Sequence, residues 1–130
     1  MLKSYFDDIL TSLSSYDWVE SADVVRHNSE SSDQKDILLY RLRVCLTDGS
    51  LLEMTERIVE FKAGGSNTTK YSFHWQNPAG KLIRRWDNAP HFPNIPTHPF
   101  HIHIGEEDVG PSKPQNALHV LALIDEEFSE

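Results

Sequence analysis

The sequence predicts an α+β fold in which an antiparallel sheet of about five strands carries an N-terminal and a C-terminal helix packed on one face. A long proline-rich strap, residues 88–100, is expected after the last long strand. Three observations favour this class: helical spacing of apolar residues at both ends, strand-like runs in the middle, and turn motifs at Asp48-Gly49 and Asn77–Gly80. At 130 residues and 14.9 kDa, the chain is expected to form a single domain, residues 1–130.

Helices are predicted at the two ends of the chain. Near the end, Ser112 and Gln115 are spaced as a capping box, with Pro114 in the first turn. In both segments the apolar side chains form one stripe along a helix. These positions are Leu2, Tyr5, Phe6, Ile9, Leu10 and Leu13 in the first helix, and Ala117, Leu118, Leu121, Ala122, Ile124 and Phe128 in the second.

The first hairpin is predicted around Asp48-Gly49, because an Asp-Gly pair between strand-like runs is typical of a two-residue turn. Before it, residues 17–26 are expected to form a strand and residues 28–34 a polar loop. A two-residue turn sets Arg41 opposite Glu56. The apolar face is then expected to hold Leu38, Tyr40, Leu42, Val44, Leu46, Leu51 and Val59, and the polar face Arg41, Arg43, Glu56 and Glu60.

A second hairpin is predicted around Asn77–Gly80, with strands over residues 70–76 and 81–87. Placing Gln76 opposite Lys81 pairs aromatic with apolar side chains, a contact that stabilises sheets. The expected pairs are Trp75 with Leu82, Tyr71 with Trp86, and Lys70 with Asp87. The same register sends a polar set to the other face, where we expect the chemistry: Ser72, His74, Gln76, Lys81, Arg85 and Asp87.

The strap contains prolines at every third position, 90, 93, 96 and 99. This is the repeat of polyproline II, so an extended, stiff segment is expected. After it, His101 and His103 alternate with isoleucines, which predicts a short strand with both imidazoles on one side. With His74, His91 and His98, five histidines fall within 30 residues.

A histidine cluster can transfer protons or bind a metal ion, since imidazole titrates near neutrality and is a common metal ligand. For His101 and His103, structural hydrogen bonding is the third interpretation. His74 is either a surface residue or a catalytic one. Asp87 either ends a strand before a turn or orients an imidazole, that of His74 or His91.

The net charge of −8 is unevenly distributed along the chain. Residues 1–36 carry −5, residues 37–86 carry +4, and residues 87–130 carry −7. A basic surface formed by the middle part of the chain could still bind an anionic partner such as RNA, despite the negative net charge. The single Cys45 and the lack of an apolar leader predict a cytoplasmic protein that is not associated with a membrane.

Three motifs, YSFHWQ at 71–76, RWDNAPH at 85–91 and HPFHIH at 98–103, resemble the TumE-like family of bacterial and archaeal toxin-antitoxin proteins. The similarity spans most of the chain. It implies a cytoplasmic toxin that a cognate antitoxin, encoded beside it, binds and silences. Phe92 and Phe100 stand where members of the family often have histidine, so neither takes a ligand or proton-transfer role here.

The leading hypothesis is a toxin that cleaves RNA without a metal or other cofactor. His74 and either His103 or His101 would transfer protons. Arg85 would stabilise the phosphate, Asp87 would orient the imidazole, and His91 would line the site.

Two alternatives stay open. In the first, His101 and His103 bind zinc or manganese together with His91 or Asp87, which gives a metal-dependent hydrolase or nuclease. In the second, the protein is a non-enzymatic module whose strap binds a partner protein through Phe92, Ile95 and Phe100.

Overall fold

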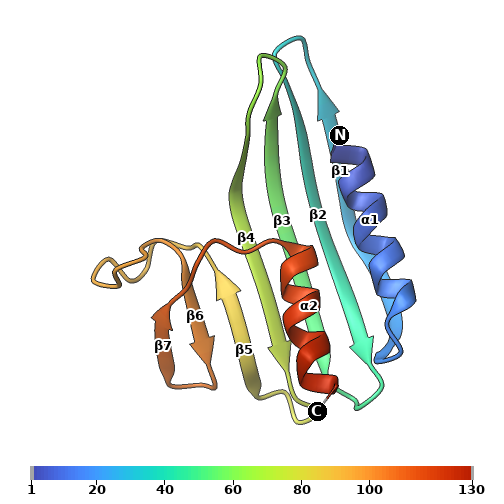
Figure 1. Ribbon diagram of the computed structural model, residues 1–130, viewed down its shortest axis with the longest axis vertical. Helices are drawn as coiled ribbons and strands as arrows, with labels where there is room; N and C mark the ends of the chain where they lie inside the picture. The colour runs from blue at the N-terminus through green and yellow to red at the C-terminus, as the bar shows by residue number, and fades with distance from the viewer. Residues whose placement is uncertain (1, 130) are drawn as a thin grey trace.

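The computed structural model describes residues 2–129, in which two helices and one seven-stranded antiparallel sheet are found (Figure 1). Met1 and Glu130 of the predicted single domain lie outside the described residues. The α+β class is confirmed, but the prediction of about five strands is wrong. The elements are α1 Leu2–Ser15, β1 Val19–Ser31, β2 Lys35–Leu46, β3 Leu51–Phe61, β4 Ser66–Gln76, β5 Leu82–Asp87, β6 His101–Ile104, β7 Asp108–Pro111 and α2 Ala117–Phe128.

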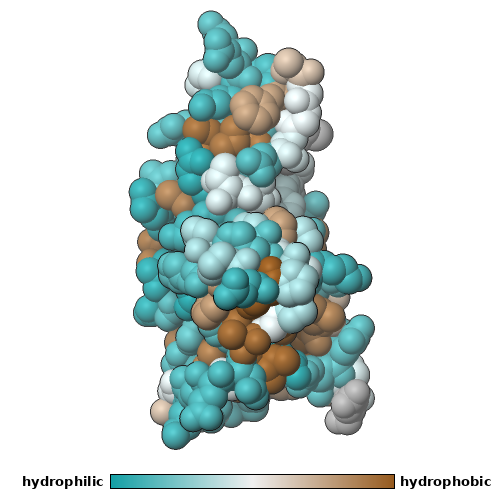
Figure 2. All heavy atoms as spheres, turned by 90° about the vertical axis from the view of Figure 1, so that its left-hand side faces the viewer, coloured by the Kyte–Doolittle hydropathy of each residue, from teal (hydrophilic) through white to brown (hydrophobic). Residues whose placement is uncertain are grey.

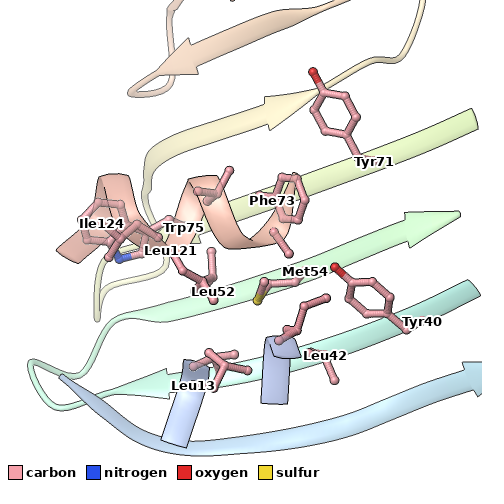
Figure 3. Packing of buried hydrophobic residues seen from close by; sticks show 14 of the residues in the cluster. Leu13, Tyr40, Leu42, Leu52, Met54, Tyr71, Phe73, Trp75, Leu121 and Ile124 are labelled. Atoms are coloured by element: carbon pink, nitrogen blue, oxygen red, sulfur yellow. The ribbon is translucent and has the colours of Figure 1, made fainter. Parts of the chain in front are cut away.

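Each strand pairs with the next one along the chain, so the sheet is a meander in the order β1 to β7. Figure 1 shows α1 beside β1 and β2, and α2 in front of β3 and β4. Side chains of both helices join one buried cluster with the same face of the sheet, which Figure 3 shows from close by. Its fully buried members include Ile9, Leu42, Met54, Phe73 and Leu121. The helices therefore cover one face, and the opposite face, called the open face below, is left uncovered by them.

The first hairpin differs from the prediction by one residue. Its loop has three residues, since the Gly49 N–H donates to the Leu46 carbonyl and the Leu46 N–H donates to the Ser50 carbonyl. Gly49 has φ +87°, the left-handed conformation that closes such a loop. As a result Tyr40, not Arg41, stands opposite Glu56.

A one-residue slip moves every side chain of a strand to the other face. Glu56 and Glu60, predicted on the polar face, therefore lie on the helix side, where Glu56 is buried, and Leu51 and Val59, predicted on the apolar face, lie on the open face. All four predictions were wrong because the turn contains one more residue than a two-residue hairpin.

The second hairpin is shifted by two residues, which preserves the faces. The Asn77 side chain accepts hydrogen bonds from the Ala79 and Lys81 N–H groups, and a bulge follows between Trp75 and Gln76. The predicted pairs are wrong: Trp75 pairs with Arg84, Phe73 with Trp86, and Ser72 with Asp87. His74, Arg85 and Asp87 nevertheless share the open face, as predicted.

The expected polyproline II strap is not found. Residues 92–100 form successive turns, because the N–H groups of Ile95, His98 and Phe100 donate to carbonyls three residues earlier. Proline suits such turns as well as an extended helix, since both need a φ near −65°. The strap therefore folds back on itself.

Three further boundaries differ from the prediction. β1 continues to Ser31, so the expected polar loop shrinks to residues 32–34. Asn116, not Ser112, caps α2, because its side chain accepts the His119 N–H.

β7 was not predicted, and it forms the second edge of the sheet beside β6. Figure 2 faces this edge and shows apolar atoms gathered below its centre; exposed Ile104 and Val109 belong to this hairpin.

In the described part of the chain, neither helix combines the length and the apolar character needed to span a bilayer.

Glu56 is a buried carboxyl group in the apolar layer. The hydroxyl groups of Tyr5 and Tyr40 donate to its Oε1, whereas its Oε2 has no partner in the described residues. Burial raises the pKa of Glu56, and the two hydroxyl groups offset this rise only in part. A carboxyl group whose pKa is raised by folding stabilises the fold at low pH, and this contribution is lost as the pH rises.

We predict that Glu56→Gln removes this pH dependence, because an amide does not ionise. The free energy of unfolding of E56Q, relative to the parent, should increase by on the order of 1 kcal/mol between about pH 4 and pH 8. Urea unfolding across this range measures it, with Glu60→Gln, a partly buried glutamate of the same strand, as the control. A difference that does not change with pH would contradict the prediction.

Candidate functional site

The open face of β4, β5 and β6 carries a two-by-three arrangement of polar side chains. Successive side chains of a strand alternate between faces, and residues directly opposite share a face. The registers place His74 opposite Arg85 and Arg85 opposite His103. Two residues away along each strand, and on the same face, the neighbouring row consists of Ser72, Asp87 and His101.

Asp87 lies at the centre of this arrangement and is only 5% exposed. Its Oδ1 lies 2.8 Å from His101 Nε2 and accepts the Ala89 N–H at 3.0 Å. Its Oδ2 accepts from Arg85 Nε at 2.7 Å. The carboxylate therefore orients Arg85 and His101, and not His74 or His91 as expected from the sequence.

His101 is 2% exposed, and both of its ring nitrogens are occupied. Nδ1 lies 2.9 Å from the Pro99 carbonyl, and Nε2 faces the Asp87 carboxylate. Because both partners are oxygen acceptors, only a ring protonated on both nitrogens donates both hydrogen bonds. No nitrogen of His101 is left for a substrate, which makes it a positioning residue.

His74 lies in a groove of about 310 Å³ on the open face. Its Nδ1 lies 3.2 Å from Arg85 Nη1, and its Nε2 lies 3.2 Å from Gln76 Oε1. Arginine can only donate, so Nδ1 accepts and Nε2 carries the proton. The orientation of the His74 ring is thus fixed by Arg85 and Gln76.

His103 is the least constrained imidazole of the cluster. Within the described residues its ring nitrogens have no hydrogen-bond partner. The ring packs against Phe92, with centroids 5.6 Å apart, and against His101 at 5.0 Å. Burial lowers the pKa of His103 and outweighs the opposite effect of Asp87. The ring is therefore neutral at pH 7 and free to accept a proton.

The strap contributes differently from the prediction. His91 is exposed and outside the cluster; its ring contacts Phe92, with centroids 6.5 Å apart. Phe92 packs with its edge against the rings of both His101 and His103. The carbonyl of Phe92 lies 3.2 Å from His98 Nδ1, and Phe100 stacks on Tyr71. The two phenylalanines thus make contacts within the protein.

Phe92 was missed as a member of the site. The resemblance drew attention to position 92, where members of the family often have histidine, but gave Phe92 no role in the site. Its contact with the histidines of β6 could not be predicted, because only the successive turns of the strap return its ring to them. Gln76 was predicted on the polar face, and it lies there two residues from His74, with its Oε1 3.2 Å from the imidazole.

Three of these side chains could hold a metal ion. One ligand atom each from Asp87, His101 and His103 lies within 4.8 Å of the others. The hydrogen bond from His101 Nδ1 to a carbonyl is the support that metal-binding histidines usually have. The Arg85 guanidinium, bound to Asp87, opposes a second cation at this place. His91 does not belong to this group.

The comparison with protein families matches nearly the whole chain. The family model described as Toxin TumE covers residues 9–129, which include every residue of the site. No curated protein and no solved structure matches the chain. Such a toxin acts in a toxin-antitoxin system, and the family therefore implies an antitoxin partner. The resemblance carried by the three sequence motifs is confirmed, and the chain belongs to the TumE toxin family.

Proposed function

We propose that this toxin cleaves RNA without a metal ion, with His74 and His103 as the proton-transfer groups and Arg85 between them. One observation carries the proposal: the three residues stand directly opposite one another on neighbouring strands of the open face. A cation flanked by two imidazoles is the arrangement that phosphodiester cleavage by general acid and base needs.

The spacing suits one phosphate group. Neighbouring strands lie about 4.8 Å apart, so the backbones of His74 and His103 are separated by about 10 Å. A phosphate over Arg85 is then within reach of both imidazole side chains. Asp87 holds the guanidinium in place through Nε, so the carboxylate does not occupy the terminal nitrogens, of which Nη1 is bonded to His74 until a phosphate displaces that bond.

His103 is assigned as the base. It takes the proton of the 2′-hydroxyl group, whose oxygen attacks phosphorus, and the bond to the 5′-oxygen breaks. The products are a 2′,3′-cyclic phosphate and a 5′-hydroxyl, which receives its proton from His74. Arg85 stabilises the charge that develops on the phosphate oxygens.

His74 becomes the acid when the substrate binds. A phosphate that accepts the Arg85 Nη1 hydrogen bond frees His74 Nδ1, which then binds a proton. His101 supports the site indirectly, because it holds Asp87, which in turn holds Arg85. Removing the His101 ring leaves a buried carboxylate without one of its partners. A loss of toxicity in His101→Ala alone would therefore report on folding as well as on chemistry.

We predict that His103→Ala and His74→Ala each lower RNA cleavage by about 10² to 10⁴-fold, the usual contribution of one proton transfer. Growth inhibition on induced expression and cleavage of a labelled RNA by purified protein measure the effect. His119→Ala, an exposed histidine of α2 outside the site, should behave as the parent. Both site variants remaining fully active, at parental expression and melting temperature, would reject the assignment.

The pH profile tests the role of His103 independently. Because its pKa is lowered, the acidic limb of kcat/KM should have its midpoint below the ordinary histidine value of about 6.5. Phe92→Ala exposes the ring to water and should move that midpoint upward, since burial is the largest cause of the lowering. The control is Ile104→Ala, next to His103 on the opposite face. The His103 ring signal in NMR titrations should shift in the same direction, and an unshifted midpoint in F92A would refute this role of Phe92.

A metal-dependent nuclease is the second candidate, favoured by the close approach of donor atoms from Asp87, His101 and His103. Here the chemistry would depend on zinc or manganese held by these three residues.

Metal removal separates the two candidates. We expect untagged protein dialysed against a strong chelator to retain its RNA cleavage, and elemental analysis to find no stoichiometric metal. Loss of cleavage on chelation and its return on adding zinc or manganese would favour the second candidate.

A further inference from the structure

Positive charge is concentrated on the open face of an acidic protein. Although the net charge is −8, strands β2 to β5 carry five cationic side chains against two carboxylates in the central part of this face. The cations are Arg41, Arg43, Arg57, Lys70 and Arg85, and the carboxylates are Glu53 and Asp87.

Both carboxylates are already engaged. Glu53 lies 2.6 Å from Arg41 and 3.6 Å from Arg43, and Asp87 holds Arg85. Neither Arg57 nor Lys70 has a carboxylate partner in the described residues. The open face therefore keeps unneutralised positive charge next to the site.

Cations also stand directly opposite one another. Arg57 pairs with Lys70 across β3 and β4. Arg26 pairs with Arg41 across β1 and β2, but there Glu53 already holds Arg41, and Asp23 of β1 stands opposite Arg43. Like charges in directly opposed positions destabilise a sheet. An anion bound between them removes this repulsion, so the arrangement favours a ligand with negative charge.

These cations adjoin the groove that contains His74. Side chains of β2 to β5 line this groove, and three of them are cationic: Arg41, Lys70 and Arg85. Four neighbouring strands span about 14 Å, more than one phosphate group occupies. The remaining lining is polar: Glu53, Thr55, Ser72, His74 and Gln76.

We propose that this groove binds the backbone of single-stranded RNA beside the cleavage site, with Lys70 and Arg41 contacting phosphates next to the one held by Arg85. The nature of the ligand rests on the proposed function. A groove of positive charge that follows the backbone along an open sheet is typical of single-strand binding. A chain crossing the strands from β6 toward β2 passes over the catalytic pair and then over these cations.

The test is the salt dependence of binding for a probe that the protein cannot cleave. A fluorescent 2′-O-methyl oligouridylate of about six nucleotides lacks the attacking hydroxyl group, so anisotropy measures binding alone. In single strands each phosphate contact contributes about −0.7 to the slope of log K against log salt, which is about 2.6-fold in Kd between about 50 and 200 mM. Lys70→Gln should reduce the salt-dependent rise in Kd by this factor.

Lys3→Gln is the matched control, because it makes the same charge change at an exposed residue of α1, the helix that covers the other face. K3Q should keep the parental salt dependence. A K70Q variant indistinguishable from K3Q would overturn the proposal. Because the probe is not cleaved, binding and cleavage are measured separately. If binding depends on Lys70 but the protein does not cut RNA, the proposed reaction is rejected and the binding groove is retained. If the protein cuts RNA but binding does not depend on Lys70, the binding groove is rejected and the reaction is retained.

Discussion

The buried carboxylate of Asp87 is the interaction on which the site depends. It is bound on one side by the Arg85 guanidinium and on the other by the ring of His101, whose second nitrogen faces the Pro99 carbonyl. One side chain thereby fixes β5, β6 and the end of the strap relative to one another. A buried carboxylate needs such partners, because an unpaired charge in the interior is strongly unfavourable. The ion pair that Asp87 needs in the interior therefore also positions Arg85, the arginine of the proposed active site.

Within the cluster, burial separates histidines that look equivalent in the sequence. His101 and His103 are two residues apart on one strand and point to one face, yet His101 is saturated by oxygen acceptors and His103 is not. The ring of Phe92 withdraws His103 from water without offering it a hydrogen bond. A neutral imidazole with a free nitrogen results, next to an arginine that is held by its own partner.

The two faces of the sheet have opposite requirements. The helix side buries apolar residues and tolerates the single carboxyl of Glu56, whose pKa is raised there. The open face carries charges that repel one another across β3 and β4, a local cost to folding that a bound anion would remove. An overall excess of acids keeps this positive region distinct from the rest of the surface, which suits selective attraction of an anionic ligand.

Alternation along each strand is a local property, so the sequence by itself determined that Arg85 and Asp87 share a face, that His101 and His103 point the same way, and that helices close both ends. That His74 shares the face of Arg85 depended on the register, and this prediction held because the hairpin is shifted by two residues, an even number. Register and burial are not local. The three-residue loop at Gly49 and the bulge beside Gln76 decided which residues stand opposite, and placed Glu56 in the interior and His74 across from Arg85. The turns of the strap excluded His91 and brought in Phe92. Only the tertiary structure decided these points, because they depend on where the backbone finds its hydrogen bonds between segments far apart in the chain.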